Sequence, residues 1–194
     1  KGETYGAIYG YDWVKSLDQM SKQLPAGKSI ADYEVNNEGY VVPKGSQGSL
    51  LEKPVKLNDA NGALAFVKMG SGLPDFTMGI SNNITYKNFT LYFLFDIKSG
   101  GDVYNRKSQW LTRDNRNGIM DMGGKAASEK KAYDYYQAFY DVNTNNSYWV
   151  EDASFVKLRE FAIGYTVKGS ALPGLSKVVK TMNARIIGRN LLTF

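Results

Sequence analysis

The sequence predicts an all-β fold, an antiparallel meander of strands, and two adjacent alternating stretches support that prediction. In the second stretch, apolar side chains occupy every other position from Phe89 to Ile97, and mostly polar side chains lie between them. The first stretch alternates in the same way from Phe76 to Ile84. Successive side chains of a strand point to opposite sides, so each stretch should form a strand with one apolar and one polar face.

The two stretches are expected to pair as a hairpin. Tyr86-Lys87-Asn88 lies between them and is short enough for a hairpin connection. Each arm has roughly 9 to 11 residues, which is the length that a tilted strand needs to cross a bilayer. A hairpin of a soluble β-sandwich would show the same alternation. The pattern alone therefore leaves a sandwich and a membrane barrel open.

Less regular elements are expected elsewhere in the chain. A short helical turn is predicted over 16–22, with Pro25 and Gly27 to end it. A helix is predicted within 128–140, where several aromatic side chains can share a face. Strand patterns, one of them a small hairpin around a glycine turn, are expected at 1–14, 30–48, 64–67, 154–167 and 178–189.

The connections between the long strands alternate in length. The connections at 86–88 and 168–176 are short, whereas the segment 99–152 is long and rich in Gly, Asn and charged residues. A segment of this length without clear strands is unusual inside a compact domain, which predicts a functional or locally structured region. Outer-membrane barrels alternate short periplasmic turns with long external loops in this way.

Composition excludes several classes of function. The chain of 194 residues has no Cys and no His, which removes disulfides, Ser-His-Asp catalysis and His-rich metal sites. We expect no cofactor and no metal. A net charge of +5 with both signs mixed does not indicate a nucleic-acid partner. No run of about 18 apolar residues is present, so no transmembrane helix is expected. The 14 Tyr and 20 Gly residues suit β architecture.

Gly100-Gly101-Asp102 opens the long segment and could be mistaken for a phosphate-binding loop. A phosphate cradle would need a longer glycine pattern that leads into a helix N-terminus. We interpret these residues as a loop start in which glycine relieves backbone strain.

Three motifs, in this order, resemble a known family. The first motif runs from Gly72 to Asn105 and contains GISN, YKNFTL and GGDVYN. The second runs from Ser154 to Tyr165 and contains SFVKLRE. The third is GRNLLTF, from Gly188 to Phe194. The chain is similar in these motifs to the SusC/RagA family of TonB-dependent outer-membrane transporters. The resemblance covers about the last two thirds of the chain, and the opening Gly2 to Tyr11 is similar less specifically.

The resemblance implies a fold, a location and partners, and it implies that the chain is not an enzyme. The chain would form part of a transmembrane barrel in the bacterial outer membrane, in contact with lipid, with long extracellular loops. The family imports oligosaccharides or peptides with a SusD-like surface lipoprotein as a lid, and TonB drives import through a plug region that would lie upstream. The start without Met suggests a piece of a longer polypeptide. We divide it into strands and loops (1–71), a central hairpin (72–98), a long extracellular loop (99–153) and a C-terminal hairpin (154–194).

The aromatic residues of the long segment are the candidate contacts to the lid or to the substrate. The segment 99–152 holds seven basic and eight acidic residues, which suits ring stacking or packing under a protein lid better than steering an anion. The candidates are Trp110, Tyr135, Tyr136, Tyr140 and Trp149. The alternative for these side chains is that they only fold the segment. The alternative for the whole chain is a soluble β-sandwich that binds carbohydrate or serves as a structural surface module.

Overall fold

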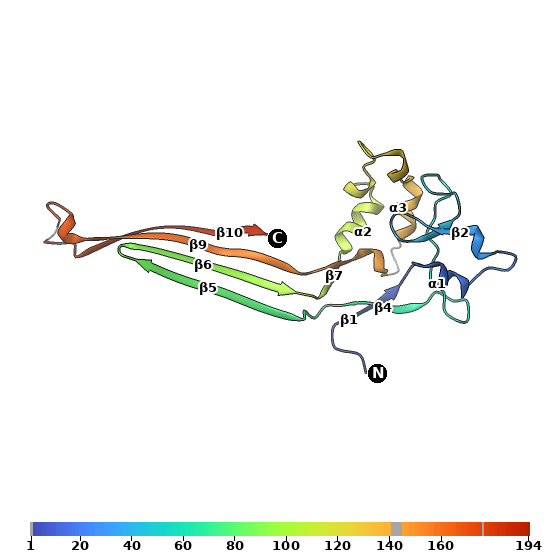
Figure 1. The fold of residues 1–194 in the computed structure, drawn as a ribbon, viewed down its shortest axis with the longest axis horizontal. Coiled ribbons are helices and arrows are strands. Elements are labelled where there is room, and N and C mark those ends of the chain that lie inside the picture. The colour runs from blue at the N-terminus through green and yellow to red at the C-terminus, as the bar shows by residue number, and fades with distance from the viewer. Residues whose placement is uncertain (1, 141–144, 176) are drawn as a thin grey trace. The chain divides into compact units, whose positions relative to one another are not determined.

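The computed structural model describes residues 2–140, 145–175 and 177–194 (Figure 1). The chain divides into two compact units, each formed by two separate stretches of sequence. Unit 1 comprises the residues up to Gly72 together with Asp102–Glu151. Unit 2 comprises Leu73–Gly101 and Asp152–Phe194. None of the helices in the described residues is long and apolar enough to cross a membrane.

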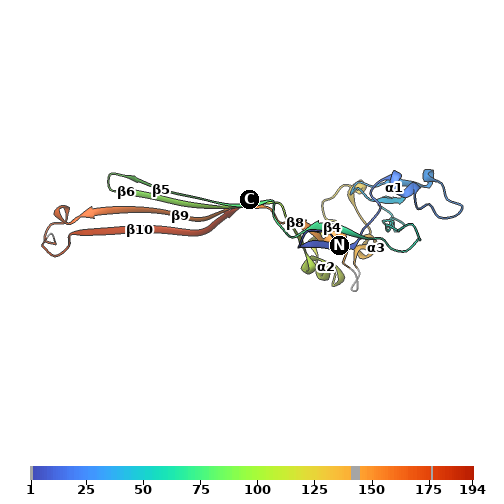
Figure 2. The same ribbon diagram turned by 90° about the horizontal axis from the view of Figure 1, so that it is seen from below.

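Unit 2 is one antiparallel sheet of four long strands. The strands are β5 (Phe76–Tyr86), β6 (Phe89–Ser99), β9 (Phe155–Lys168) and β10 (Thr181–Thr193), in the order β10-β9-β6-β5. They run side by side in Figures 1 and 2. The four expected strands and their antiparallel pairing are confirmed, although β10 begins three residues later than the expected 178.

The expected hairpin is confirmed, and its turn is tight. β5 and β6 pair from Tyr86↔Phe89 to Phe76↔Ser99 without a register shift. Only Lys87 and Asn88 remain between the strands, and Lys87 takes a left-handed φ of 52°. The Asn88 carbonyl accepts a hydrogen bond from the Thr166 amide at 2.8 Å, which ties the turn to β9.

The register separates apolar from charged side chains across the sheet. Directly paired residues of antiparallel strands share a face, so Ile80 lies with Phe95, Leu91 with Ile163 and Ile163 with Ile186. This apolar face carries no charged side chain. The other face, called the polar face below, holds every charged residue of the four strands: Asp96, Lys98, Lys157, Arg159, Glu160, Lys168, Arg185 and Arg189.

The sheet is open at both edges and uncovered on its apolar face. Among the described residues, β5 and β10 each pair with one neighbour only. Unit 2 contains no second sheet in its described residues that could cover the apolar side chains, and Phe76, Ile163 and Ile186 remain 50%, 47% and 81% exposed. A β-sandwich would bury these side chains between two sheets. The fold is therefore that of an all-β sheet without a sandwich partner.

Unit 1 is built from short elements. β1 (Ala7–Tyr11) pairs with β4 (Phe66–Ser71), β2 (Tyr33–Val35) with β3 (Val41–Pro43), and β7 (Asp102–Tyr104) with β8 (Val150–Asp152). Its helices are α1 (Leu17–Ser21), α2 (Arg106–Arg113) and α3 (Tyr133–Phe139). Single 3-10 turns occupy Ile30–Asp32, Gly118–Met120, Ala127–Glu129 and Ser147–Trp149, and unit 2 has another at Gly169–Ala171.

Several expected elements of unit 1 are shorter than predicted. The strand expected over 1–14 is wrong in its length, because Trp13 and Val14 turn into the core instead of continuing β1. The helix expected within 128–140 forms only at Tyr133–Phe139, preceded by a 3-10 turn. The small hairpin at 30–48 is confirmed as β2 and β3, and the strand expected at 64–67 is β4, which runs on to Ser71.

The described residues of the segment 102–151, which exclude 141–144, are locally structured, as the length of the segment predicted. Asn105 caps α2 by accepting a hydrogen bond from the Ser108 amide at 2.9 Å. Gly100 and Gly101, just before this segment, have φ of 74° and 82°, and a Cβ on Gly100 would lie 2.4 Å from Asp75 Oδ2. These two positions therefore require glycine, which confirms their interpretation as a strained loop start.

Two apolar clusters hold unit 1 together. The first contains Val14, Met20 and Val41, and it anchors α1 through Met20. The second is aromatic and joins Trp13 from the N-terminal stretch to side chains of 135–149. The long segment and the first 72 residues thus share one core, which sequence periodicity could not reveal because the contacts join residues more than 120 positions apart.

Candidate functional site

The structure distributes the five candidate aromatic residues between a core and a surface. Tyr135, Tyr136 and Trp149 are buried together with Trp13 and Phe139. Trp110 on α2 is 46% exposed, and Tyr140 at the C-terminal end of α3 is half-buried. The rings of three of the five candidates are therefore buried in the core. The other two candidates, Trp110 and Tyr140, have exposed surface that another molecule can contact.

The buried aromatic rings pack around Phe139. The ring centroids of Trp13 and Tyr135 lie 4.9 and 5.3 Å from that of Phe139, both in edge-to-face geometry. The Trp149 indole Nε1 donates a hydrogen bond to the Phe139 carbonyl at 2.9 Å. Edge-to-face pairs of this kind contribute beyond area burial. The cluster thereby fixes α3 and the Ser147–Trp149 turn against the N-terminal stretch.

A buried polar network borders the cluster. The Lys131 ammonium and the Glu52 carboxylate, whose side chains are 1% and 0% exposed, lie 2.5 Å apart. Asn36 Nδ2 donates to Glu52 Oε1 and to the Tyr135 hydroxyl, both at 2.9 Å, and that hydroxyl donates to Glu38 at 3.0 Å. Each polar group of the network has a partner, which is the condition under which buried charge is tolerated.

The phenols in this region resist ionisation. Burial, and to a smaller extent the charge of Glu38, raises the pKa of Tyr136 to about 12. Burial also raises the pKa of Tyr40 to about 12, with Asp12 and Glu38 adding to the effect. Burial raises the pKa of Tyr135 and Tyr148 as well. The Tyr135 and Tyr136 hydroxyls act as neutral hydrogen-bond donors to Glu38, and none of the four phenols is poised as a base.

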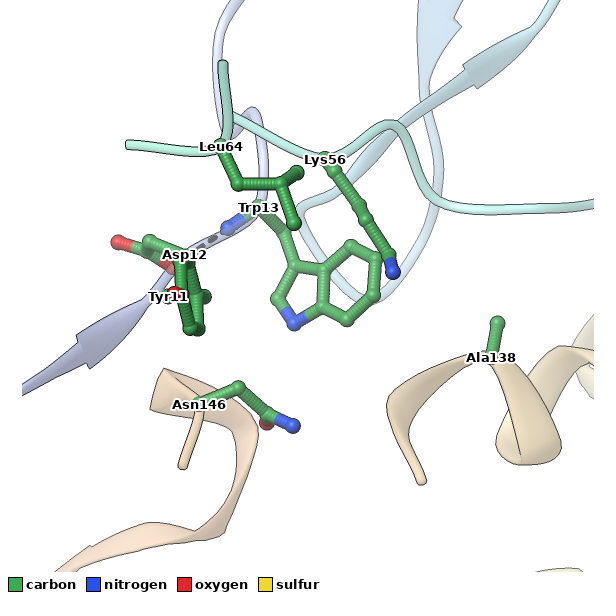
Figure 3. Close-up of a pocket in the computed structure, with 7 residues that line it drawn as sticks. All are labelled: Tyr11, Asp12, Trp13, Lys56, Leu64, Ala138 and Asn146. Carbon is green, nitrogen blue, oxygen red and sulfur yellow. Dashed lines mark hydrogen bonds between the residues drawn. The ribbon is translucent and has the colours of Figure 1, made fainter. Parts of the chain in front are cut away.

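A small cavity adjoins Trp13 (Figure 3). It has about 20 Å³ and is lined by Tyr11, Asp12, Trp13, Lys56, Leu64, Ala138 and Asn146. Within the described part of unit 1, the buried indole Nε1 of Trp13 has no hydrogen-bond partner. A cavity of this size is large enough for one water molecule. The site is too small for a sugar ring or a peptide side chain.

The Trp110 surface is cationic on its flanks. The guanidinium groups of Arg106 and Arg113 lie 5.8 and 5.2 Å from the Trp110 ring. Arg113 donates to both carboxylate oxygens of Asp114, at 2.7 and 3.1 Å. These hydrogen bonds, and to a smaller extent Tyr140, raise the pKa of Arg113. Arg113 thereby places the two accessible candidates, Trp110 and Tyr140, at one surface.

The polar face of unit 2 carries a second set of charged contacts. Arg159 on β9 reaches Asp96 on β6 at 2.7 Å. Glu160, the next residue, contacts Arg189 at 3.3 Å and Arg185 at 3.9 Å on β10. The Arg185 guanidinium also lies 5.8 Å from the Tyr92 ring. Among the described residues, no group of acidic side chains is arranged to hold a metal ion.

A β-bulge explains how consecutive residues of β9 share the polar face. Leu94 pairs with Glu160 but Phe95 pairs with Leu158, so Arg159 is an extra residue in β9. β10 is irregular at the same level, where Asn190 has a φ of 50° and accepts a weak hydrogen bond from Arg159 at 3.4 Å. Sequence analysis missed this bulge. Its signal was the spacing of Leu158 and Phe161, whose apolar side chains are three positions apart.

Comparison with known proteins gives relatives of one kind. No family profile matches the chain. The chain is 26% identical over its whole length to TonB-dependent receptor P3 of Formosa agariphila, and 25% identical over 96% of its length to TonB-dependent receptor P39 of the same organism. It covers 18% and 21% of those two receptors. The chain thus spans about a fifth of the length of these curated relatives.

Solved structures of one importer share the fold. The RagAB peptide importer in its open-open state superimposes with a TM-score of 0.54, at 15% identity, over 97% of this chain and 19% of the importer chain. Its closed-closed state gives a TM-score of 0.50 at 16% identity, with the same coverage. These identities establish likeness of fold.

The comparisons agree with the motifs found in the sequence. The relatives are receptors and transporters, and TonB-dependent receptors are proteins of the bacterial outer membrane, which is the location of this chain. The all-β fold expected from alternation is the fold of the matching part of such a transporter. The resemblance is thereby confirmed: the chain is similar over its whole length to one part of a TonB-dependent receptor, and it shares the fold of one part of the RagAB importer, a transporter of the SusC/RagA type.

Proposed function

We propose that the chain forms part of the wall and of the external surface of an outer-membrane importer for oligosaccharides or peptides. Unit 2 would be the wall. Its apolar face would contact lipid and its polar face would line the interior. The main support for this arrangement is that all charged side chains of the four strands lie on one face. A lipid-facing charge is expensive, whereas interior positions of a barrel are polar.

Aromatic side chains near the hairpin turn support the lipid assignment. Tyr86, Phe89 and Tyr165 meet at the Lys87-Asn88 end of the sheet, where Phe89 and Tyr165 have ring centroids 4.6 Å apart. Such rings gather at the interface between lipid and water in membrane barrels. Strands of 11 residues, at about 3.3 Å per residue and a tilt of about 45°, rise about 25 Å, which matches the apolar band of such barrels.

Unit 1 would supply the external surface. If the two-residue turn is periplasmic, β6 runs outward and the segment 99–153 lies outside the cell. There it would meet a SusD-like lipoprotein lid or the incoming substrate, while TonB would act through the plug region of the parent protein. Trp110 and Tyr140 are the candidates with accessible surface, and Tyr135, Tyr136 and Trp149 would support them from the core.

The lipid assignment is tested by a neighbouring pair of positions. In the full-length transporter, which is reconstituted in vesicles, a spin label would replace Leu91 or Tyr92. The label at position 91 should be accessible to oxygen, which concentrates in lipid. The label at position 92 should be accessible to a water-soluble nickel reagent instead. Equal accessibility of both positions to both reagents would refute a wall with one lipid face and one interior face.

The external surface is tested by matched alanine variants. Trp110→Ala should weaken binding of the lid or of the substrate without changing stability, because its ring is exposed. Tyr135→Ala should reduce stability by about 3–5 kcal/mol, as a large buried side chain does. If Trp110→Ala leaves uptake and lid binding unchanged, the alternative remains that these aromatic side chains only fold the segment.

A further inference from the structure

The polar face of unit 2 is strongly cationic. Its six basic side chains are Lys98, Lys157, Arg159, Lys168, Arg185 and Arg189, and its two acidic side chains are Asp96 and Glu160. Both carboxylates already form ion pairs. Asp96 pairs with Arg159, and Glu160 pairs with both Arg185 and Arg189. The acidic residues of this face therefore leave most of its positive charge uncompensated.

The surplus is not neutralised by other charged side chains of the sheet. Within the described residues, Lys157 and Lys168 form no ion pair, and the Lys157 ammonium lies over the Phe155 ring at 4.2 Å. A wall that carries one sign of charge beside a low-dielectric layer concentrates ions of the opposite sign. The face is thus suited to attract anions.

A hollow lies on this face, in the half of the sheet nearest the Lys87-Asn88 turn. It has about 450 Å³ and is lined by Asn83, Thr90, Tyr92, Glu160, Ala162 and Arg185. Ala162 contributes only a methyl group to the lining. Gly164, the next residue of β9 on this face, lets Thr90 approach closely, because a Cβ there would lie 2.4 Å from Thr90 Oγ1. The volume is in the range of small-molecule sites.

The lining combines neutral hydrogen-bonding groups with one guanidinium and one carboxylate, that of Glu160. Asn83, Thr90 and Tyr92 offer an amide and two hydroxyls, and Arg185 extends from β10 toward Tyr92. Glu160 holds Arg185 only at 3.9 Å and is closer to Arg189, at 3.3 Å. Arg185 therefore keeps donors for a further acceptor, and a guanidinium matches the geometry of a carboxylate.

We propose that this hollow binds a carboxylate-bearing unit of the transported chain, with Arg185 on the carboxylate and Asn83, Thr90 and Tyr92 on its neighbouring polar groups. The inference rests on the proposed function, because it takes the polar face as the interior of the importer. An acidic oligosaccharide and an acidic peptide present the same anionic group. The site therefore indicates that the cargo is acidic, and the experiment distinguishes an acidic oligosaccharide from an acidic peptide.

The test compares acidic probes with their neutral twins on the purified full-length transporter. One pair is oligogalacturonate and its methyl ester, and the other is oligoglutamate and oligoglutamine. At least one acidic probe should bind about tenfold tighter than its twin, as expected for one charge-assisted hydrogen-bonded contact. The preference should fall as salt is added. The pair that shows the preference identifies the cargo as sugar or peptide.

Variants connect the preference to the hollow. Arg185→Gln should remove most of the tenfold preference. Lys22→Gln neutralises an exposed lysine that follows α1 and pairs with Asp18, and it should leave the preference intact. Equal binding of acidic and neutral twins, no binding of any probe, or an unchanged preference in Arg185→Gln would each overturn the proposal. Labels at positions 91 and 92 test the wall separately, so a correct labelling pattern in the same preparation would leave the proposed function standing.

Discussion

Arg159 donates two hydrogen bonds to a single carboxylate oxygen of Asp96, from Nε at 2.9 Å and from Nη2 at 2.7 Å. The pair joins β9 to β6 at the level of the bulge, on the polar face. Both side chains are partly exposed, at 40% and 34%, so solvent weakens the attraction. The contact orients the strands more than it stabilises them.

The two faces of β6 should respond differently to a change of charge. Phe93→Arg places a cation on the apolar face and should destabilise the full-length barrel by about 2–4 kcal/mol near the bilayer midplane. Asp96→Asn should lose less than about 1 kcal/mol, because it alters a solvent-screened pair. Urea titration of the protein folded into vesicles measures both. Similar losses in the two variants would contradict the assignment of the faces.

The bulge should be dispensable for the two faces of β9. Deletion of Arg159 would leave Leu158 and Phe161 two positions apart, and side chains at that spacing in a regular strand share a face. The deletion would therefore keep both side chains on the apolar face and Glu160 on the polar face. Arg159→Ala keeps the residue count and loses the contacts with Asp96 and Asn190. Both variants of the full-length barrel should fold, scored by heat-modifiable electrophoretic mobility. Loss of folding in the deletion alone would show that the barrel requires the extra residue.

Two buried tryptophans form a matched pair for the Trp13 cavity. Trp149→Phe loses a hydrogen bond to the Phe139 carbonyl, whereas Trp13→Phe removes an N–H without a partner among the described residues. Both variants lose the same volume from one cluster. The Phe139 carbonyl keeps the Asn146 amide as a donor, so Trp149→Phe should be less stable than Trp13→Phe by about 0.5–1.5 kcal/mol, measured by denaturant unfolding of the full-length protein. A larger loss in Trp13→Phe would mean that its indole N–H is satisfied by a bound water.

The buried ion pair should show strong coupling. Lys131→Met would leave Glu52 charged and fully buried, with only Asn36 and the Gly48 amide as donors, and should destabilise by about 3–5 kcal/mol. Adding Glu52→Gln should recover a large part of that loss, because the neutral amide needs no counter-ion. A double-mutant cycle of unfolding free energies measures the recovery. Additive losses in the two single variants would contradict a coupled pair.

Unit 1 should lose stability at alkaline pH. The folded pKa of Tyr136, at about 12, exceeds the ordinary 10.0, so folding favours the neutral phenol. This contribution is complete below pH 10 and is lost as pH rises toward 12. The difference in phenolate absorbance between the full-length protein and Tyr136→Phe reports this residue alone. Because burial is the larger cause, Glu38→Gln should lower the pKa of Tyr136 only part of the way to 10. Ionisation near pH 10 in the parent protein would contradict the burial.

Local patterns predicted unit 2 well and unit 1 poorly, for a physical reason. Alternation over Phe76–Tyr86 and Phe89–Ser99 predicted that both stretches are strands, which side chains share a face, and that the two strands pair with each other. The pairing is well specified because a one-residue slip would exchange the apolar and the polar face. Trp13 and Tyr135 carry no such periodic signal, and they join one cluster only when the chain closes over more than 100 residues. The accessible surface of Trp110 and the burial of Trp149 could not be distinguished by composition either.

The bulge at Arg159 has a consequence for the size of the passage. Each extra residue in one strand changes the stagger between neighbouring strands, and the strand number and the total stagger together set the radius of a closed barrel. The irregularity of β10 at Asn190 lies beside it and changes the stagger again. Insertions and deletions along β9 and β10 would therefore change the radius of the barrel. They would widen or narrow the passage through the whole transporter, even where no side chain in contact with the cargo has changed.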